Sequence, residues 1–438
     1  MLTLLPYPSE EAEARIERIG SRRIGADPKI EAQVREILDA VRAEGDEALL
    51  RYTRRFDAPG LALQDLTVTE QEIRQAYEAV DEGFLRMVRA AAANIEAFHR
   101  HQLRTSYFTT CNDGTFLGQM VRPVESAGLY VPGGKGGETP LISSVLMNGL
   151  PARIAGVPDL ALVTTPRRDG SVNPCLLVAA TEVGIHRIHK VGSAWAVAAL
   201  AFGTPSVRRV DVIVGPGNIY VAAAKKLVSG EVGIDMLAGP SEILVVADDS
   251  ARADYIAADL LSQAEHDPMA GAVLITTDGV LAARVEETLR AQMKKLPRSG
   301  IAAKALEDYG AAFLVDNLDG AMELANRLAP EHLELHVREP LSLLGKVRNA
   351  GAVFLGELTP EAVGDYFAGP NHVLPTAGTA RFSSALGVEN FLKRTSVIAY
   401  SRVALDRDAS SIIRLAELEG LQAHAASVRV RLNQVDEL

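Results

Sequence analysis

Cysteine and tryptophan are scarce in this sequence of 438 residues, which has two cysteines and one tryptophan. Cys111 and Cys175 lie far apart and form no C-x-x-C pair. A disulfide framework is therefore excluded, and a reducing compartment is expected. Because the sequence has no pair of cysteines that could hold a metal ion, we expect nitrogen and oxygen atoms to hold any bound metal ion.

The chain also lacks an excess of positive charge and a long apolar run. Its net charge is −11, with 45 Lys and Arg against 56 Asp and Glu, which disfavours binding to a phosphate backbone. The most apolar stretch, around residues 194–202, is much shorter than the roughly 18 residues that span a bilayer. The opening MLTLLPYPSEEAEAR has no basic region of a signal peptide. We expect a cytoplasmic protein without nucleic-acid or membrane partners.

The length predicts at least two domains, because single hydrophobic cores stop growing near about 250 to 300 residues. From Pro28 to about Leu103 the apolar spacing is helical, and Thr69 to Glu72 forms a capping box that starts a separate helix. After Gly118, short β-branched runs such as LALVTT and EILVVAD alternate with helical segments. This alternation predicts an α/β fold with two Rossmann-like parallel-sheet domains.

These patterns predict four parts of the chain. We expect residues 1–27 to form an N-terminal arm. Residues 28–129 and 238–382 are assigned to one α/β domain, which carries most of the candidate site residues, and residues 130–237 to a second α/β domain. Residues 383–438 are mostly helical and too small to stand alone, so we expect them to dock on another domain or a partner subunit.

Two glycine-rich turns follow strand-like runs: YVPGGKGG, which begins at Tyr130, and VGPGN, which ends at Asn218. Neither is a GxGxxG fingerprint or a Walker loop. A structural turn explains the first, and a helix cap explains Asn218. Alternatively, Asn218 contacts a cofactor at the carboxyl end of a parallel strand, where α/β sheets usually bind ligands. Ser241, in AGPSE, is a turn residue by default.

Two polar pairs point to chemistry. Gln263 and His266 lie at i and i+3 in SQAEHDP, so they leave the same face of the last turn of a helix. Glu331 and His332, in APEHLEL, stand where a strand begins and offer two proton acceptors of different basicity. His336 lies on the His332 side of that strand, and we interpret it as a supporting or surface residue.

Two further pairs follow. GDYFAGPNHVLPT places Asp365 and His372 in a loop punctuated by glycine and proline, and EGLQAH places Glu419 and His424 in the helical C-terminal part. Turn chemistry explains the glycines of the loop, but not a carboxylate and an imidazole together. Taken singly, each of these residues is also explained as an ordinary surface residue.

In this order and in these surroundings, the motifs resemble those of histidinol dehydrogenase. The resemblance includes YVPGG, PARIAGV, VGPGN and IDMLAGPSE and spans nearly the whole chain from about Pro28. It implies a zinc ion held by Gln263, His266, Asp365 and His424. In that family the equivalent of His424 comes from the other subunit, which implies a homodimer with shared active sites.

The resemblance also implies the reaction. In the family, L-histidinol is oxidised to L-histidine through the aldehyde, and each of the two oxidations passes a hydride to NAD. Ser241, Glu331, His332, His372 and Glu419 then surround the substrate, together with the zinc ligands. We assign His332 as the base that takes the alcohol proton and Glu331 as the residue that activates water.

For NAD the resemblance points to Tyr130, Asn218 and a third position at which this chain departs from the family. The family's GGAQA is GSAWA here, so Trp195 replaces a glutamine. An indole donates one hydrogen bond and accepts none, although it can stack on a flat ring. Leu237 also stands where a proline is common, and a KGGE insertion follows Tyr130. We therefore expect weak NAD binding.

Three alternatives stay open at this point. The first is a relative that oxidises another small polar alcohol, such as a sulfonated propanediol. Such an enzyme would depend less on the complete set of zinc ligands, because its substrate has no imidazole. A zinc hydrolase would use Glu331 to activate water and would bind no nucleotide. A purely structural or binding protein would leave the acids and imidazoles without an explanation.

Overall fold

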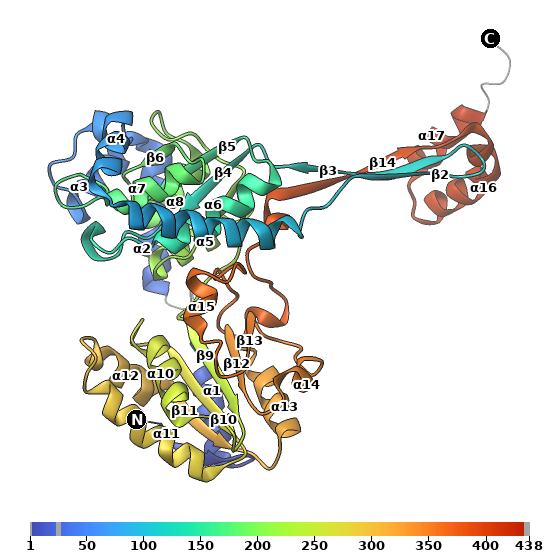
Figure 1. The fold of residues 1–438 in the computed structure, drawn as a ribbon. Coiled ribbons are helices and arrows are strands. Elements are labelled where there is room, and N and C mark those ends of the chain that lie inside the picture. The colour runs from blue at the N-terminus through green and yellow to red at the C-terminus, as the bar shows by residue number, and fades with distance from the viewer. Residues whose placement is uncertain (1, 23–27, 433–438) are drawn as a thin grey trace. The chain divides into compact units, whose positions relative to one another are not determined.

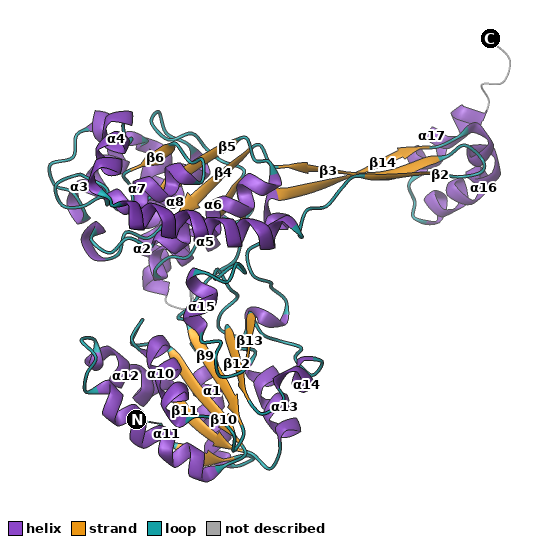
Figure 2. Cartoon of the chain, in the orientation of Figure 1, coloured by secondary structure: helices purple, strands orange, loops and turns teal. Residues whose placement is uncertain are grey.

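The structure is a computed structural model that describes residues 2–22 and 28–432. The chain divides into two compact units (Figure 1). Unit 1 comprises Met1–Gln102 and Val124–Phe391, and unit 2 comprises Leu103–Pro123 and Leu392–Leu438. Unit 1 contains two parallel sheets and unit 2 a small antiparallel sheet, shown as orange arrows in Figure 2. The expected fold class, two parallel-sheet α/β domains, is confirmed.

The first sheet of unit 1 has five parallel strands in the order β6-β5-β4-β7-β8. Its strands are β4 (Ser126–Tyr130), β5 (Asp159–Val163), β6 (Arg187–His189), β7 (Val212–Val214) and β8 (Gly233–Ile234). The helices that belong with this sheet are α2 (Pro28–Glu44), α3 (Asp46–Phe56), α4 (Glu70–Ala79), α5 (Glu82–Arg100), α6 (Ile142–Ala155), α7 (Pro174–Glu182), α8 (Ser193–Phe202) and α9 (Ile219–Val228). The strand order reverses between β4 and β7, so a ligand crevice is expected at the carboxyl ends of these two strands.

The second sheet of unit 1 has six parallel strands in the order β1-β11-β10-β9-β12-β13. Its strands are β1 (Leu4–Pro6), β9 (Glu242–Ala247), β10 (Gly271–Thr276), β11 (Gly310–Leu314), β12 (His332–His336) and β13 (Ala352–Leu355). Its helices are α1 (Glu10–Gly20), α10 (Ala253–Ala264), α11 (Gly279–Met293), α12 (Ser299–Tyr309), α13 (Leu318–Leu328), α14 (Pro340–Leu344) and α15 (Glu361–Tyr366). Apolar cores cover both faces, one around Leu260 and Leu274 and the other around Phe313 and Leu335.

The helices of residues 28–100 pack against helices α6 to α9, which belong with the five-stranded sheet, and this corrects the expected division of the chain. We had joined residues 28–129 to residues 238–382. Instead, Val34 and Leu38 of α2 are buried in one apolar core with Leu200 of α8 and Val221 of α9. The amphipathic period of these helices showed that they have a buried face, but it did not identify the sheet that covers this face.

The expected N-terminal arm, residues 1–27, is also different. β1 is an edge strand that pairs with β11 in parallel, and α1 packs Ala12, Ile16 and Ile19 into the core beside it. The capping box at Thr69 is confirmed, because Thr69 and Glu72 exchange both hydrogen bonds at the start of α4. Residues 23–27 of the arm lie outside the described residues.

Unit 2 is built from two distant segments. β2 (Tyr107–Thr110), β3 (Phe116–Pro123) and β14 (Leu392–Ala399) form its antiparallel sheet, and α16 (Arg402–Leu418) and α17 (Gln422–Leu432) follow. We had expected residues 383–438 to be mostly helical, but β14 pairs along its whole length with β3. Residues 433–438 lie outside the described residues. None of the described helices in either unit combines the length and the apolarity that crossing a membrane requires.

Candidate active site

The expected catalytic pair lies where β12 begins, next to the start of β9. β12 is confirmed as a strand from His332 to His336, and it pairs with β9 so that His332 stands opposite Ile243. The strand order reverses at this point, since β10 and β11 lie on one side of β9 and β12 on the other. The pair therefore occupies a topological switch point, but at the amino ends of the strands.

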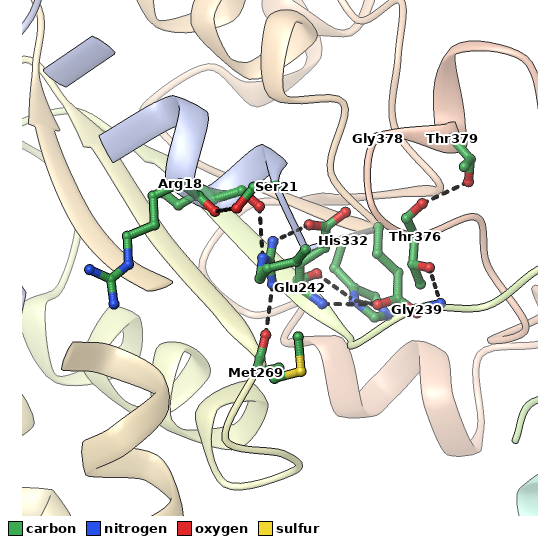
Figure 3. Close-up of polar contacts among 12 residues, drawn as sticks. Arg18, Ser21, Gly239, Glu242, Met269, His332, Thr376, Gly378 and Thr379 are labelled. Carbon is green, nitrogen blue, oxygen red and sulfur yellow. Dashed lines mark hydrogen bonds and ion pairs between the residues drawn. The ribbon is translucent and has the colours of Figure 1, made fainter. Parts of the chain in front are cut away.

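The backbone of Glu242 holds both side chains of the pair. Its N–H donates to Oε2 of Glu331 at 3.0 Å. Its carbonyl oxygen lies 3.0 Å from Nδ1 of His332, and Figure 3 labels both of these residues. Both side chains are almost fully buried. Because a carbonyl can only accept, Nδ1 of His332 carries the proton and Nε2 is the basic nitrogen.

Burial changes the proton affinity of the pair in opposite directions. The pKa of Glu331 is well above its ordinary value because the carboxyl group is buried and Glu242 is close. The pKa of His332 is lowered by its burial, although Asp365 opposes this effect. The imidazole is therefore neutral near pH 7, as a general base must be.

Gln263 and Asp365 lie beside this pair. α10 ends at Ala264, and its buried Gln263 side chain lies beside Glu361. With its amide nitrogen turned toward Glu361, Gln263 donates to both carboxylate oxygens at 3.2 Å. The same nitrogen lies 3.2 Å from Nδ1 of His332, which cannot accept from it while Nδ1 donates to Glu242. Ligand atoms of His332, Glu361 and Asp365 all lie within 4.8 Å of one another. Asp365 is the only one of these three that we had assigned to zinc.

Sequence reasoning missed Glu361. It is buried in the first turn of α15, with Oε1 at 3.6 Å from Nε2 of His332. Burial and the neighbouring Glu334 raise the pKa of Glu361 to about 8. The signal was present, because Glu361 and Asp365 are spaced i and i+4 and so share one face of the helix.

The other expected residues are distributed over both units. Ser241 immediately precedes Glu242, and His266 follows α10 and is exposed. His372 lines a cavity of about 360 Å³ together with His332 and Asp365, and burial lowers the pKa of His372 to about 4. Glu419 and His424 belong to unit 2, where both are exposed.

A second cavity, of about 620 Å³, joins the three residues expected to contact NAD: Tyr130, Trp195 and Asn218. It lies where the crevice was expected, at the carboxyl ends of β4 and β7. Gly215 lets these ends approach each other, since its φ is +114° and an added Cβ would lie 2.1 Å from the Tyr130 carbonyl oxygen. Asn218 does cap α9, because its Oδ1 accepts from the N–H groups of Tyr220 and Val221.

Trp195 contacts other residues of the chain in this cavity. Its ring stacks on Tyr52 at 5.9 Å and on Phe56 at 5.5 Å, measured between ring centroids. Its Nε1–H donates to Oγ1 of Thr53 at 3.1 Å. The indole therefore has no free donor for a ligand. Arg55 of α3 and Asp57, which directly follows this helix, also line the cavity. The sequence analysis identified neither of them.

Comparison with known proteins decides the family. The sequence model of histidinol dehydrogenase matches residues 21–432. The chain belongs to the histidinol dehydrogenase family. It is 55% identical to a histidinol dehydrogenase of Desulfotalea psychrophila over 424 residues, which cover 97% of this chain and 98% of that one. It is 50% identical to one of Heliobacterium mobile over 434 residues, which cover 99% and 100%.

A solved structure supports the same family assignment. The histidinol dehydrogenase of Elizabethkingia anophelis superposes with a TM-score of 0.92 at 35% identity and covers 100% of this chain and 99% of its own. The protein is therefore an oxidoreductase of this family. This result decides against the zinc hydrolase and against a purely structural protein.

Proposed function

We propose that the chain oxidises L-histidinol to L-histidine in two NAD-dependent steps, as a cytoplasmic homodimer with one zinc ion per subunit. The observation that carries this proposal is the buried Glu331 and His332 pair on the backbone of Glu242, beside Gln263 and Asp365. A chain of this family with an acid and a neutral imidazole in one buried cluster fits the chemistry of both oxidations.

Zinc fits the residues that are present. Gln263 directs its amide oxygen away from Glu361 when its nitrogen faces Glu361, and Asp365 offers a carboxylate at the edge of the cavity with His332. His266 follows one turn after Gln263 and adds an imidazole, and His424 of the partner subunit completes the set. When bound, the zinc ion anchors and orients the imidazole and amino groups of histidinol.

His332 moves the protons of both oxidations. Its Nε2 takes the alcohol proton while a hydride leaves the carbon for NAD, which gives the aldehyde. In its ionised form Glu361, 3.6 Å from Nε2, stabilises the imidazolium that forms. Glu331, in its ionised form, takes a proton from water as the water adds to the aldehyde. The His332 imidazolium gives its proton to the aldehyde oxygen in the same step, which forms the hydrate and returns His332 to its neutral form. The hydrate then loses a second hydride to NAD and its proton to His332.

The remaining contacts are assigned to substrate and cofactor. Ser241 and His372 face the substrate from within the subunit, and Glu419 and His424 reach it from the partner. NAD binds in the cavity that Tyr130 and Asn218 line, and the ring of Trp195 forms part of the cavity wall. Because the indole donor is bonded to Thr53, we expect weaker NAD binding than in relatives with glutamine at this position.

The surface of unit 2 supports a homodimer. Its buried apolar side chains, among the described residues, are Ala404, Ala409, Ala416 and Ala425. Larger side chains are exposed instead: Tyr107 at 61%, Ile398 at 71%, Val403 at 64%, Leu415 at 61% and Leu418 at 66%. A unit with so small a core and so much exposed apolar surface needs a partner to cover it.

The proposal is tested by following NADH absorbance with purified protein, NAD and L-histidinol, before and after chelation of the metal. We expect two NADH per histidinol and a loss of turnover on chelation. No NADH with histidinol, but NADH with a sulfonated propanediol, would instead assign the chain to another activity.

Mixing variants tests the shared site. We expect Glu331→Gln and His424→Asn each to be inactive as homodimers. After the two are unfolded and refolded together, half of the dimers are mixed, and each mixed dimer has one intact site. About a quarter of wild-type activity should return if a symmetric dimer shares its sites. No recovery would place His424 in the same subunit's site or outside the site.

A further inference from the structure

A second cluster of buried ionisable side chains lies next to the proposed active site. Glu334 and His336 leave the same face of β12 as His332, and Asp259 comes from α10, one turn before Gln263. One ligand atom from each of Asp259, Glu334 and His336 lies within 4.8 Å of the others. The side chains of Glu334 and His336 are completely buried, and that of Asp259 is 12% exposed. His336 is therefore not a surface residue.

His336 directs an unpaired nitrogen into this cluster. Its Nε2 lies 3.3 Å from Oε2 of Glu334 and 3.7 Å from Oδ2 of Asp259. Neither ring nitrogen of His336 makes a hydrogen bond to any described residue, and the same holds for Oε2 of Glu334. Burying a polar atom without a partner is unfavourable, so these atoms are suited to bind a ligand.

The charge of the cluster indicates a cation. Among the described residues, the only ion-pair partner of Asp259 and Glu334 is His336. Two carboxyl groups thus share a buried space without a lysine or an arginine. A bound dication would remove the repulsion between the ionised carboxylates.

The distances fit a small coordination shell. Tetrahedral zinc with bonds of about 2.0–2.2 Å to nitrogen and oxygen separates its ligand atoms by roughly 3.3–3.6 Å. The two measured separations from Nε2 of His336 are 3.3 and 3.7 Å. We propose that Asp259, Glu334 and His336 bind a second divalent transition-metal ion, separate from the proposed zinc site. One imidazole and two carboxylates suit Zn²⁺ or Mn²⁺.

This ion would stabilise the position of α15 in the proposed active site. Oε1 of Glu334 accepts the backbone N–H of Glu361 at 2.9 Å, so Glu334 fixes the start of α15. An ion on Oε2 would hold the carboxylate in that position, and with it the helix that carries Glu361 and Asp365. His336 also lines a surface cavity of about 490 Å³ with Arg338 and Leu358, which gives the ion a route from solvent.

Metal content of the full-length protein tests the proposal. The protein is stripped with a chelator, equilibrated with Zn²⁺ or, in a parallel sample, Mn²⁺, and desalted, and ions per chain are counted by inductively coupled plasma mass spectrometry. We expect two ions in the wild type and one in His336→Gln or Asp259→Asn. His189→Gln, a matched control at a buried histidine of the other sheet, should keep two.

Equal ion counts in the wild type and His336→Gln would overturn the proposal. If either variant fails to fold by circular dichroism, wild-type crystals soaked in Mn²⁺ decide. An anomalous peak between His336 and Glu334 supports the second site, and its absence overturns it. This result is independent of the proposed reaction, because a chain that does not oxidise histidinol would still lose one ion on His336→Gln.

Discussion

A guanidinium nitrogen of Arg22 lies 2.6 Å from Oε2 of Glu242, and both side chains are buried. The same guanidinium donates to the carbonyl oxygens of Ile19 and Met269. Glu242 and Met269 are labelled in Figure 3. The backbone of Glu242 holds Glu331 and His332. An N-terminal residue just after α1 therefore fixes the strand end that positions the proposed acid–base pair.

Arg22→Met should destabilise the protein by roughly 3–5 kcal/mol, because it leaves the carboxylate of Glu242 buried without a partner. Glu242→Gln in the same chain should restore most of this loss, since the unpaired charge is then gone. Urea unfolding of both single variants and the double variant measures the coupling. Additive losses would show that the ion pair does not stabilise this strand end.

His332→Asn and Glu331→Gln should separate the two oxidations. We expect His332→Asn to lower kcat with L-histidinol by about 10²- to 10⁴-fold, the usual contribution of a general base. Glu331→Gln should lower the rate mainly with the aldehyde as substrate, since water addition needs a base. The measurement is steady-state NADH formation from each substrate. Normal alcohol turnover in His332→Asn, or normal aldehyde turnover in Glu331→Gln, would contradict these roles.

Trp195 is the only tryptophan of the chain, so its fluorescence reports on the cavity proposed for NAD. We expect NAD to change this emission with a dissociation constant in the micromolar range or weaker, and calorimetry to give the same value. A nanomolar constant would contradict the weak binding inferred from the indole. An unchanged emission at saturating NAD, with turnover intact, would place NAD elsewhere.

Trp195→Gln should bind NAD more tightly and fold less stably. The new amide offers an acceptor and a donor, and one net hydrogen bond of about 1 kcal/mol corresponds to roughly five-fold tighter binding. Loss of the stacking on Tyr52 and Phe56 should cost about 3 kcal/mol of stability. Trp195→Phe, which keeps a ring and adds no amide, is the control and should not tighten NAD binding.

Asp57 should make stability depend on pH. Burial raises the pKa of its carboxyl group from 3.8 to about 7. A raised acid pKa in the folded state means that the stabilisation is complete below pH 4 and is lost as pH rises through 7. Relative to Asp57→Asn, the wild type should lose on the order of 1–2 kcal/mol between pH 5 and 8, less than the full shift implies because solvent screens the group. Urea unfolding at several pH values measures the free energy of unfolding of both proteins. The same pH dependence in the wild type and in Asp57→Asn would contradict the prediction.

Local patterns explain what could be predicted at the site. The helix ending after Gln263 and the strand HLELH follow from apolar periods of 3.6 and 2, and both were found. Glu361 and Asp259 were not among the residues expected at the site. Each lies four residues before an expected ligand, and only the fold shows that the two helix faces meet β12.

The sequence by itself determined most of the helices and strands, the two parallel sheets and the order of the site motifs, because helical and strand periods and caps depend on residues close in the chain. The tertiary structure decided that α2 to α5 cover the five-stranded sheet and that β12 crosses back to lie beside β9. That crossing puts one face of β12 against α10 and α15, and so gathers His332, Glu334 and His336 with Asp259 and Glu361. Such pairings depend on which apolar faces bury each other across long sequence separations, and no local period encodes them.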